Sequence, residues 1–228
     1  SKFIQRDILH FLGKDSILDI ALGDQVQENV SIMFMDIMDY THLSETMSPR
    51  DNFNFINGYL RRVGPHIQAH GGFICQFLGD GFMAIFKERP EDALRSAILI
   101  QQEIGSYNQQ RKARQRPSIQ VGIGLHYGPV MLGIIGDHVR MDQNVISDHV
   151  NIASRIQGLT RFYGASIVVS SVLLNQIRER EAFHFRQLGK VVLKGKKEEI
   201  EVIECLEGLP DPSMKTRMKN LLTFNQGM

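Results

Sequence analysis

The order of strand-like and helix-like segments is the feature that most constrains the fold of this chain. Four apolar runs have the length and composition of strands, at about 29–36, 73–78, 82–87 and 119–126. The segments between Ser48 and Gly71 and at about 91–113 instead repeat apolar residues every three or four positions, which predicts helices with one buried face. The order is therefore strand, helix, strand, strand, helix, strand.

Local signals mark the ends of the first long helix and the hairpin that follows it. Ser48-Pro49 offers an N-cap followed by a proline at the first helical position, and Gly71-Gly72 ends the pattern. Gly64-Pro65 is expected to kink the helix. Gly79-Asp80-Gly81 predicts a tight turn between the second and third strands. The face predicted to be buried consists of Phe53, Ile56, Leu60, Val63 and Ile67.

This order is that of a ferredoxin-like βαββαβ core. We predict an α+β fold (an α/β sandwich) in which this core carries a C-terminal α/β extension. The extension is predicted to contain strands near 129–135, 166–169, 183–193 and 199–206 and helices near 148–162 and 171–180. In a ferredoxin-like core the end of the first strand lies beside the central hairpin, so we expect Asp36 and Asp80 to be neighbours.

Asp36 and Asp80 each follow an apolar run, where a carboxylate loses hydration. Burying such a group is costly unless a cation or several hydrogen-bond donors compensate it. Two carboxylates delivered by separate strands form a natural seat for hard divalent cations. The pair therefore indicates metal-assisted phosphoryl chemistry.

Composition excludes several other classes of protein. With 228 residues, 43% apolar and 22% charged, and a net charge of +1, the chain is typical of a globular domain without a global field for nucleic acid or membrane. The basic stretch 111–116 is interpreted as a solvated helix end. Cys75 and Cys205 have neither metal nor redox spacing, which fits a reducing, cytoplasmic location. No signal peptide or membrane-length apolar run is present, and the start at Ser1 indicates a fragment of a longer chain.

Five motifs in one order carry a resemblance to a known family. They are Asp36-Ile37-Met38-Asp39-Tyr40-Thr41, Gly79-Asp80-Gly81-Phe82, the segment 122–130, Val150-Asn151-Ile152-Ala153-Ser154-Arg155 and Val192-Leu193-Lys194-Gly195-Lys196. Over about 25–206 the chain resembles the catalytic domain of the class III nucleotidyl cyclases. Several linked motifs are far more specific than any single one.

The resemblance implies a reaction in which the ribose 3′-hydroxyl attacks the α-phosphate of a nucleoside triphosphate and pyrophosphate leaves. Two divalent cations, Mg²⁺ or Mn²⁺, would be held by Asp36, Asp80 and the backbone carbonyl of Ile37. Asn151 would orient the ribose. Arg155, one helical turn later on the same face, would stabilise charge on the phosphates with its guanidinium fork. Lys194 would contact the terminal phosphate, although Lys196 and Lys197 are alternatives.

The predicted base pocket departs from the family pattern. Gln76 stands where adenylyl cyclases usually carry lysine and guanylyl cyclases carry glutamate. Asn144 stands where adenylyl cyclases carry aspartate or threonine and guanylyl cyclases often carry cysteine. Each amide offers both a donor and an acceptor, so it can rotate to suit adenine or guanine. We predict an adenylyl cyclase making cyclic AMP from ATP with relaxed purine selectivity. The alternative is a guanylyl cyclase that takes GTP and makes cyclic GMP. Ser147 is expected to cap the helix that carries Asn151.

The resemblance also implies a head-to-tail homodimer, because family members build each site from two catalytic domains. This chain carries both sets of residues, so two equivalent sites are expected. The segment 1–24 resembles the transducer element that precedes many such domains and implies an upstream sensor. We assign 25–208 to the catalytic domain and 209–228 to a polar tail. No nucleic-acid partner and no membrane contact are expected from this part of the protein.

Three other classes of protein are alternatives to an active cyclase. A catalytically silent cyclase-homology module would not need Asp36, Asp80, Asn151 and Arg155 together. A GGDEF-type dinucleotide cyclase would need an acidic pair after two glycines, which is missing. An RNA-binding ferredoxin-like module would need exposed aromatic residues on central strands, whereas the runs around Phe73 and Phe77 have a buried pattern. His66 and His70 share a helix face but have no third ligand in the sequence, so we interpret them as a solvated face.

Overall fold

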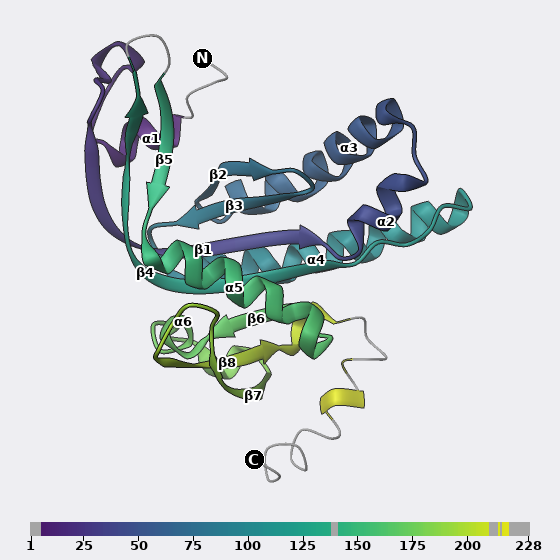
Figure 1. Cartoon of the computed structure of the whole chain (residues 1–228). Coiled ribbons are helices and arrows are strands. Elements are labelled where there is room, and N and C mark those ends of the chain that lie inside the picture. The colour runs from purple at the N-terminus through teal and green to yellow at the C-terminus, as the bar shows by residue number, and fades with distance from the viewer. Residues whose placement is uncertain (1–5, 138–140, 210–213, 215, 219–228) are drawn as a thin grey trace.

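The computed structural model describes residues 6–137, 141–209, 214 and 216–218 (Figure 1). Its strands form one sheet in the order β2-β3-β1-β4-β6-β8-β7, with β5 paired to β4. The strands are β1 (Gln25–Ile37), β2 (Gly72–Leu78), β3 (Gly81–Phe86), β4 (Val121–Gly136), β5 (Met141–Ile146), β6 (Ile167–Ser170), β7 (Phe185–Val192) and β8 (Glu199–Cys205). The α-helices are α1 (Arg6–Phe11), α2 (Tyr40–Glu45), α3 (Pro49–Gln68), α4 (Pro90–Ala113), α5 (Asp148–Tyr163) and α6 (Ser171–Leu174).

The predicted βαββαβ core is confirmed by β1, α3, β2, β3, α4 and β4 in that order. Strand β1 lies between β3 and β4 and pairs antiparallel with both, so Met35 is opposite Phe82 and Asp36 is opposite Gly122. Because side chains alternate along a strand, β1 supplies both layers of the core. Met33 and Met35 pack with α3 and α4, whereas Val30 and Ile32 pack with α1 and α5. The sheet is therefore covered on both faces, as an α/β sandwich requires.

Helix α3 begins as predicted, because Ser48 Oγ accepts the Asp51 N–H at 3.1 Å. Its buried face differs from the prediction. Phe55, Tyr59, Val63 and Ile67 are buried, whereas Phe53 is 71% exposed. At 3.6 residues per turn, Phe53 lies well outside the stripe made by positions four apart. Tyr59 was missed because tyrosine is less often fully buried than the aliphatic residues around it.

Three features of the C-terminal half differ from the prediction. The strands expected at 119–126 and 129–135 are a single strand, β4, because Gly128 and Pro129 remain paired with Val30 and Asn29 of β1. Strand β5 was not predicted. The helix expected at 171–180 is only the four-residue α6.

The aromatic residues of β2 also differ from the prediction. Phe73 is buried as expected, but Phe77 is 57% exposed. Strand β2 is the edge of the sheet and has a register shift between Ile74 and Gln76, and a bulge of this kind changes which side chains face the core. A single exposed aromatic on an edge strand does not make the stacking platform of an RNA-binding sheet. Across the described residues, we find no helix with the length and apolar character needed to cross a membrane.

Candidate active site

Asp36 and Asp80 are brought together at one end of β1. Asp36 is the penultimate residue of β1, and Asp80 lies in the β2–β3 turn, where the Ile37 N–H donates to Asp80 Oδ2 at 3.2 Å. Gly81 permits this close approach, since a Cβ there would lie 2.4 Å from the Met35 carbonyl oxygen. The hydroxyl of the buried Tyr59 donates to the Asp80 carbonyl and so fixes the turn to α3. The predicted proximity of the two aspartates is confirmed.

The electrostatics of this pair favour a bound cation. Burial, together with the hydrogen bond and the negative charge of Asp36, raises the pKa of Asp80 to about 7. Among the described residues, no cluster of three or more histidine, cysteine, aspartate or glutamate side chains could hold a metal by itself. Magnesium typically uses one or two carboxylates together with substrate phosphates. Two poorly compensated carboxylates therefore fit a divalent cation whose remaining ligands come from the backbone and the substrate.

A cavity opens beside Asp36 towards helix α5. The strand side is formed by Asp36, Ile37 and Met38, and the helix side by Gln157, Gly158, Thr160 and Arg161. The sheet and helix touch closely here, because a Cβ on Gly124 would lie 2.2 Å from the Gln157 backbone nitrogen. Ile37, the predicted backbone ligand, thus lines the same cavity as Asp36.

Helix α5 carries Asn151 and Arg155, one turn apart. Ser147 caps the helix as predicted: its Oγ accepts the His149 N–H at 3.0 Å and donates to the Pro129 carbonyl at 2.6 Å. Asn151 is exposed and Arg155 is half-buried. The Nη1 atom of Arg155 is buried and has no hydrogen-bond partner among the described residues. This arrangement leaves a guanidinium donor available for a ligand.

The lysine turn lies beside Arg155. A Cβ on Gly195 would lie 3.7 Å from Arg155 Nη2, so Gly195, which follows Lys194 in the chain, borders the end of the guanidinium. Lys196 forms an ion pair with Asp148 in the first turn of α5, which commits that lysine to a structural contact. Lys194 is exposed. Of the lysines considered from the sequence, Lys196 is thus the one already engaged.

Gln76 and Asn144, the predicted base-reading amides, line one cavity although they come from β2 and β5. Cavity residues that the prediction did not include are Ile8, Cys75, Met83, Leu132, Gln143 and Val145. This cavity shares no lining residue with the one beside Asp36. Within the described part of the chain, no hydrogen bond or ion pair joins Asp36 or Asp80 to Asn151, Arg155 or Lys194. The two cavities are thus lined by different residues, and Asn151, Arg155 and Lys194 line neither of them.

A buried histidine beneath α5 was missed. His126 of β4 is 1% exposed; its Nδ1 lies 2.8 Å from Ser170 Oγ and its Nε2 lies 2.9 Å from His149 Nδ1. The contact with His149 ties the first turn of α5 to the central sheet. Its only sequence signal was the position of His126 in an otherwise apolar strand, which does not reveal a partner.

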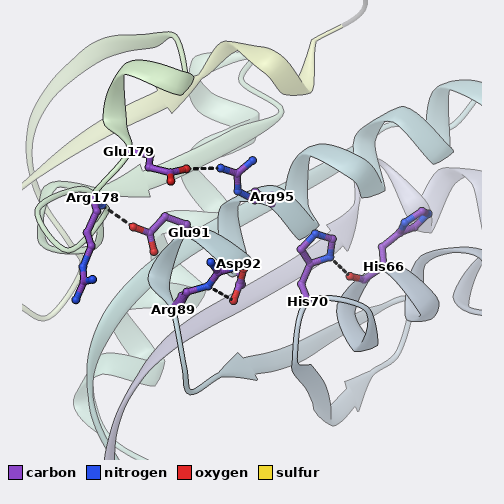
Figure 2. Close-up of polar contacts among 8 residues, drawn as sticks. All are labelled: His66, His70, Arg89, Glu91, Asp92, Arg95, Arg178 and Glu179. Atoms are coloured by element: carbon purple, nitrogen blue, oxygen red, sulfur yellow. Dashed lines mark hydrogen bonds and ion pairs between the residues drawn. The ribbon is translucent and has the colours of Figure 1, made fainter.

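Among the described residues, His66 and His70 belong to no group of three or more potential metal ligands. Figure 2 shows that His70 turns back to its own helix, where its Nδ1 lies 2.8 Å from the His66 carbonyl oxygen. The same view shows the start of α4 held to the loop after α6, since Glu91 accepts the Arg178 N–H at 2.5 Å and Arg95 pairs with Glu179 at 2.8 Å. These contacts fix the scaffold and do not include the predicted site residues.

The chain is similar to known proteins of one family. The sequence model of the adenylate and guanylate cyclase catalytic domain matches residues 22–204, and the chain belongs to this family. It is 38% identical over 209 residues to an adenylate cyclase of Anabaena cylindrica, covering 89% of this chain and 42% of that protein. The chain thus spans about two fifths of the length of that relative.

Two solved structures support the same family fold. A bacterial light-regulated adenylyl cyclase superposes with a TM-score of 0.80 at 24% identity, covering 97% of this chain and 64% of the other. The guanylyl cyclase Cya2 superposes with a TM-score of 0.69 at 27% identity, covering 82% of this chain and 95% of the other. The fold is therefore shared by enzymes named for either purine.

Proposed function

We propose that this chain is the catalytic domain of an adenylyl cyclase that converts ATP to cyclic AMP and pyrophosphate. The observation that carries the proposal is the pairing of Asp36 with Asp80 in a chain of the cyclase family. The 38% identity to an adenylate cyclase favours ATP as the substrate. Guanylyl cyclase activity is the second candidate, because the amides of Gln76 and Asn144 do not exclude guanine.

In the proposed reaction, a bond forms between the ribose 3′ oxygen and the α-phosphorus, and the bond from that phosphorus to the β-phosphate oxygen breaks. Asp36 and Asp80, with the Ile37 carbonyl, would hold two divalent cations, Mg²⁺ or Mn²⁺. The chemistry supplied by such cations is a more acidic attacking hydroxyl and partial neutralisation of the triphosphate. Asn151 orients the ribose, Arg155 stabilises charge on the phosphates, and Lys194 binds the terminal phosphate.

We propose a homodimer with composite sites. The two cavities of one copy share no lining residue, which is consistent with a nucleotide that lies between two copies and contacts one set of residues on each. One copy would supply Asp36 and Asp80, and the other would supply the base pocket, Asn151, Arg155 and Lys194. We assign residues 25–208 to this catalytic unit, 1–24 to a transducer-like segment and 209–228 to a tail. An upstream sensor is consistent with the greater length of the Anabaena relative, and cytoplasmic ATP would be the substrate pool.

The decisive experiment incubates the purified protein with ATP or GTP and with Mg²⁺ or Mn²⁺, and separates the products by chromatography. Cyclic AMP is expected from ATP, with slower formation of cyclic GMP from GTP. Faster turnover of GTP would establish the guanylyl alternative. No product under any of these conditions would leave the silent regulatory module as the better interpretation.

The composite site is tested by mixing two inactive variants. Asp36→Ala and Arg155→Ala chains should each lose activity, whereas a mixed dimer contains one intact site and should recover activity. A mixture of Asp36→Ala with Asp80→Ala is the matched control, because both changes remove the same half of the site. Equal inactivity of both mixtures would contradict shared sites.

A further inference from the structure

The side chain of Gln143 has one end held and the other end free. Its Nε2 donates to the Cys75 carbonyl oxygen at 3.0 Å, which joins β5 to β2. Its Oε1 is buried and has no hydrogen-bond partner among the residues that the structure describes. If the Gln143 amide were rotated by half a turn, its Oε1 would face the Cys75 carbonyl oxygen, and two acceptors would oppose each other. The contact with Cys75 therefore fixes Oε1 as the free acceptor.

Gln143 lies in the cavity of the predicted base-reading residues. It lines this cavity together with Gln76 and Asn144. Asn144 also has a defined orientation, because its Oδ1 accepts the Val145 N–H at 2.8 Å and leaves its amino group as the donor. Gln143 therefore has a fixed free acceptor and Asn144 a fixed free donor, and Gln76 is left as the amide that can rotate.

A buried acceptor without a partner is unfavourable, and a ligand N–H that reaches it removes the cost. We propose that Gln143 Oε1 accepts a hydrogen bond from the 6-amino group of the adenine base, which makes Gln143 a third specificity-determining residue. Adenine presents this amino group as a donor, which matches the free acceptor of Gln143. Guanine has a carbonyl oxygen at the same ring position, and that oxygen would oppose Oε1. The inference rests on the proposed nucleotide cyclase function.

Gln143 also joins β5 to β2 at the cavity, since its hydrogen bond to Cys75 connects the neighbours of Asn144 and Gln76. A substitution at Gln143 would therefore change binding of every purine nucleotide to some extent. This common effect cancels in the ratio of the kcat/KM values for two nucleotides that differ only in the 6-amino group. This ratio, rather than the rate with ATP, is the measurement that isolates the proposed hydrogen bond.

The test compares kcat/KM for ATP and for purine riboside 5′-triphosphate, which lacks the 6-amino group. The wild type should prefer ATP about tenfold, as expected for one hydrogen bond to a buried acceptor. The Gln143→Met variant should show a ratio within about twofold of unity. Gln187→Met is the matched control, because Gln187 Oε1 is also buried without a partner, but on β7 at the far end of the strand order. The control should keep the wild-type ratio.

Two results would overturn the proposal. One is a wild-type ratio near unity, which needs no variant and so does not depend on folding of Gln143→Met. The other is an unchanged ratio in Gln143→Met. Failure of the proposed function is distinct from both, because in that case the wild type forms no cyclic nucleotide from ATP at all.

Discussion

Replacing His126 with glutamine should change how the stability of the protein depends on pH. His126 is 1% exposed and lies between Ser170 and His149. Burial, together with the nearby His149, lowers the pKa of His126 to about 4 from its ordinary 6.5, and Asp148 opposes this only weakly. The folded protein therefore keeps the ring neutral at pH values where the unfolded chain already binds a proton.

The direction and size of the effect follow from proton linkage. Between pH 6.5 and pH 4 the unfolded state binds more protons, so the free energy of unfolding falls as the pH is lowered. A pKa difference of one corresponds to about 1.4 kcal/mol, so His126 contributes about 3 kcal/mol at pH 7.5 that is lost by pH 4. About 2 kcal/mol of this is already lost at pH 5. Below pH 4 both states are protonated and the contribution does not change further.

Urea unfolding between pH 5 and pH 7.5 measures this contribution as the difference between wild type and His126→Gln. The variant is expected to be less stable at pH 7.5, but to lose about 2 kcal/mol less than the wild type on going to pH 5. His42→Gln is the control, because the His42 side chain is 88% exposed, and its curve should follow that of the wild type. Parallel curves for His126→Gln and wild type would refute the reasoning.

Three further changes test the contacts around the proposed metal site. Gly124→Ala should lower the free energy of unfolding by about 3 kcal/mol, because its Cβ would lie 2.2 Å from the Gln157 nitrogen. Gly105→Ala is the control: it has open space around it and should raise the free energy of unfolding slightly. Thermal unfolding of the two variants and the wild type measures the difference. Tyr59→Phe removes the hydroxyl that donates to the Asp80 carbonyl and should raise several-fold the Mg²⁺ concentration that half-saturates a thermal shift. Asp80→Asn should abolish that shift. Without metal at pH 8 it should also raise the free energy of unfolding by about 1 to 2 kcal/mol, a value reduced for solvent screening, because Asp80 is then ionised and its raised pKa means that the charge costs more free energy in the folded state than in the unfolded chain. A stability of Asp80→Asn below that of the wild type at pH 8 would contradict this account.

The parts of the fold predicted from the sequence are those fixed by local signals. Ser48 and Ser147 cap helices because their side chains reach backbone N–H groups two or three residues ahead, a contact that is visible in the sequence itself. Gly79 and Gly81 likewise mark the turn that carries Asp80. The motif order predicted one pocket for Gln76 and Asn144, and both residues line one cavity of the structure. Their role in reading the base stays a prediction.

The residues that were missed depend on partners far away in the sequence. Strand β5 contains Asp142, Gln143 and Asn144 in succession, so it lacks the alternation that predicts a strand, and it forms because β4 extends far enough to pair with it. The hydrogen bond from Gln143 to Cys75 spans 68 positions. His126 and Tyr59 have the same property, because each is buried with its polar atoms bonded to another element. Propensity and periodicity describe neighbours along the chain, and they contain no information on such pairs.

The separation of the two cavities has a consequence for control of the proposed enzyme. If each site needs Asp36 and Asp80 from one copy and Arg155 from another, then the relative position of the copies determines whether the reacting groups meet. Both halves are rigidly built within a copy: Tyr59 holds the Asp80 turn, and Ser147, His149 and the Asp148–Lys196 ion pair hold α5. An upstream sensor would then change activity most simply by moving one copy relative to the other, which predicts a change in kcat without a change in the selectivity set by Gln143.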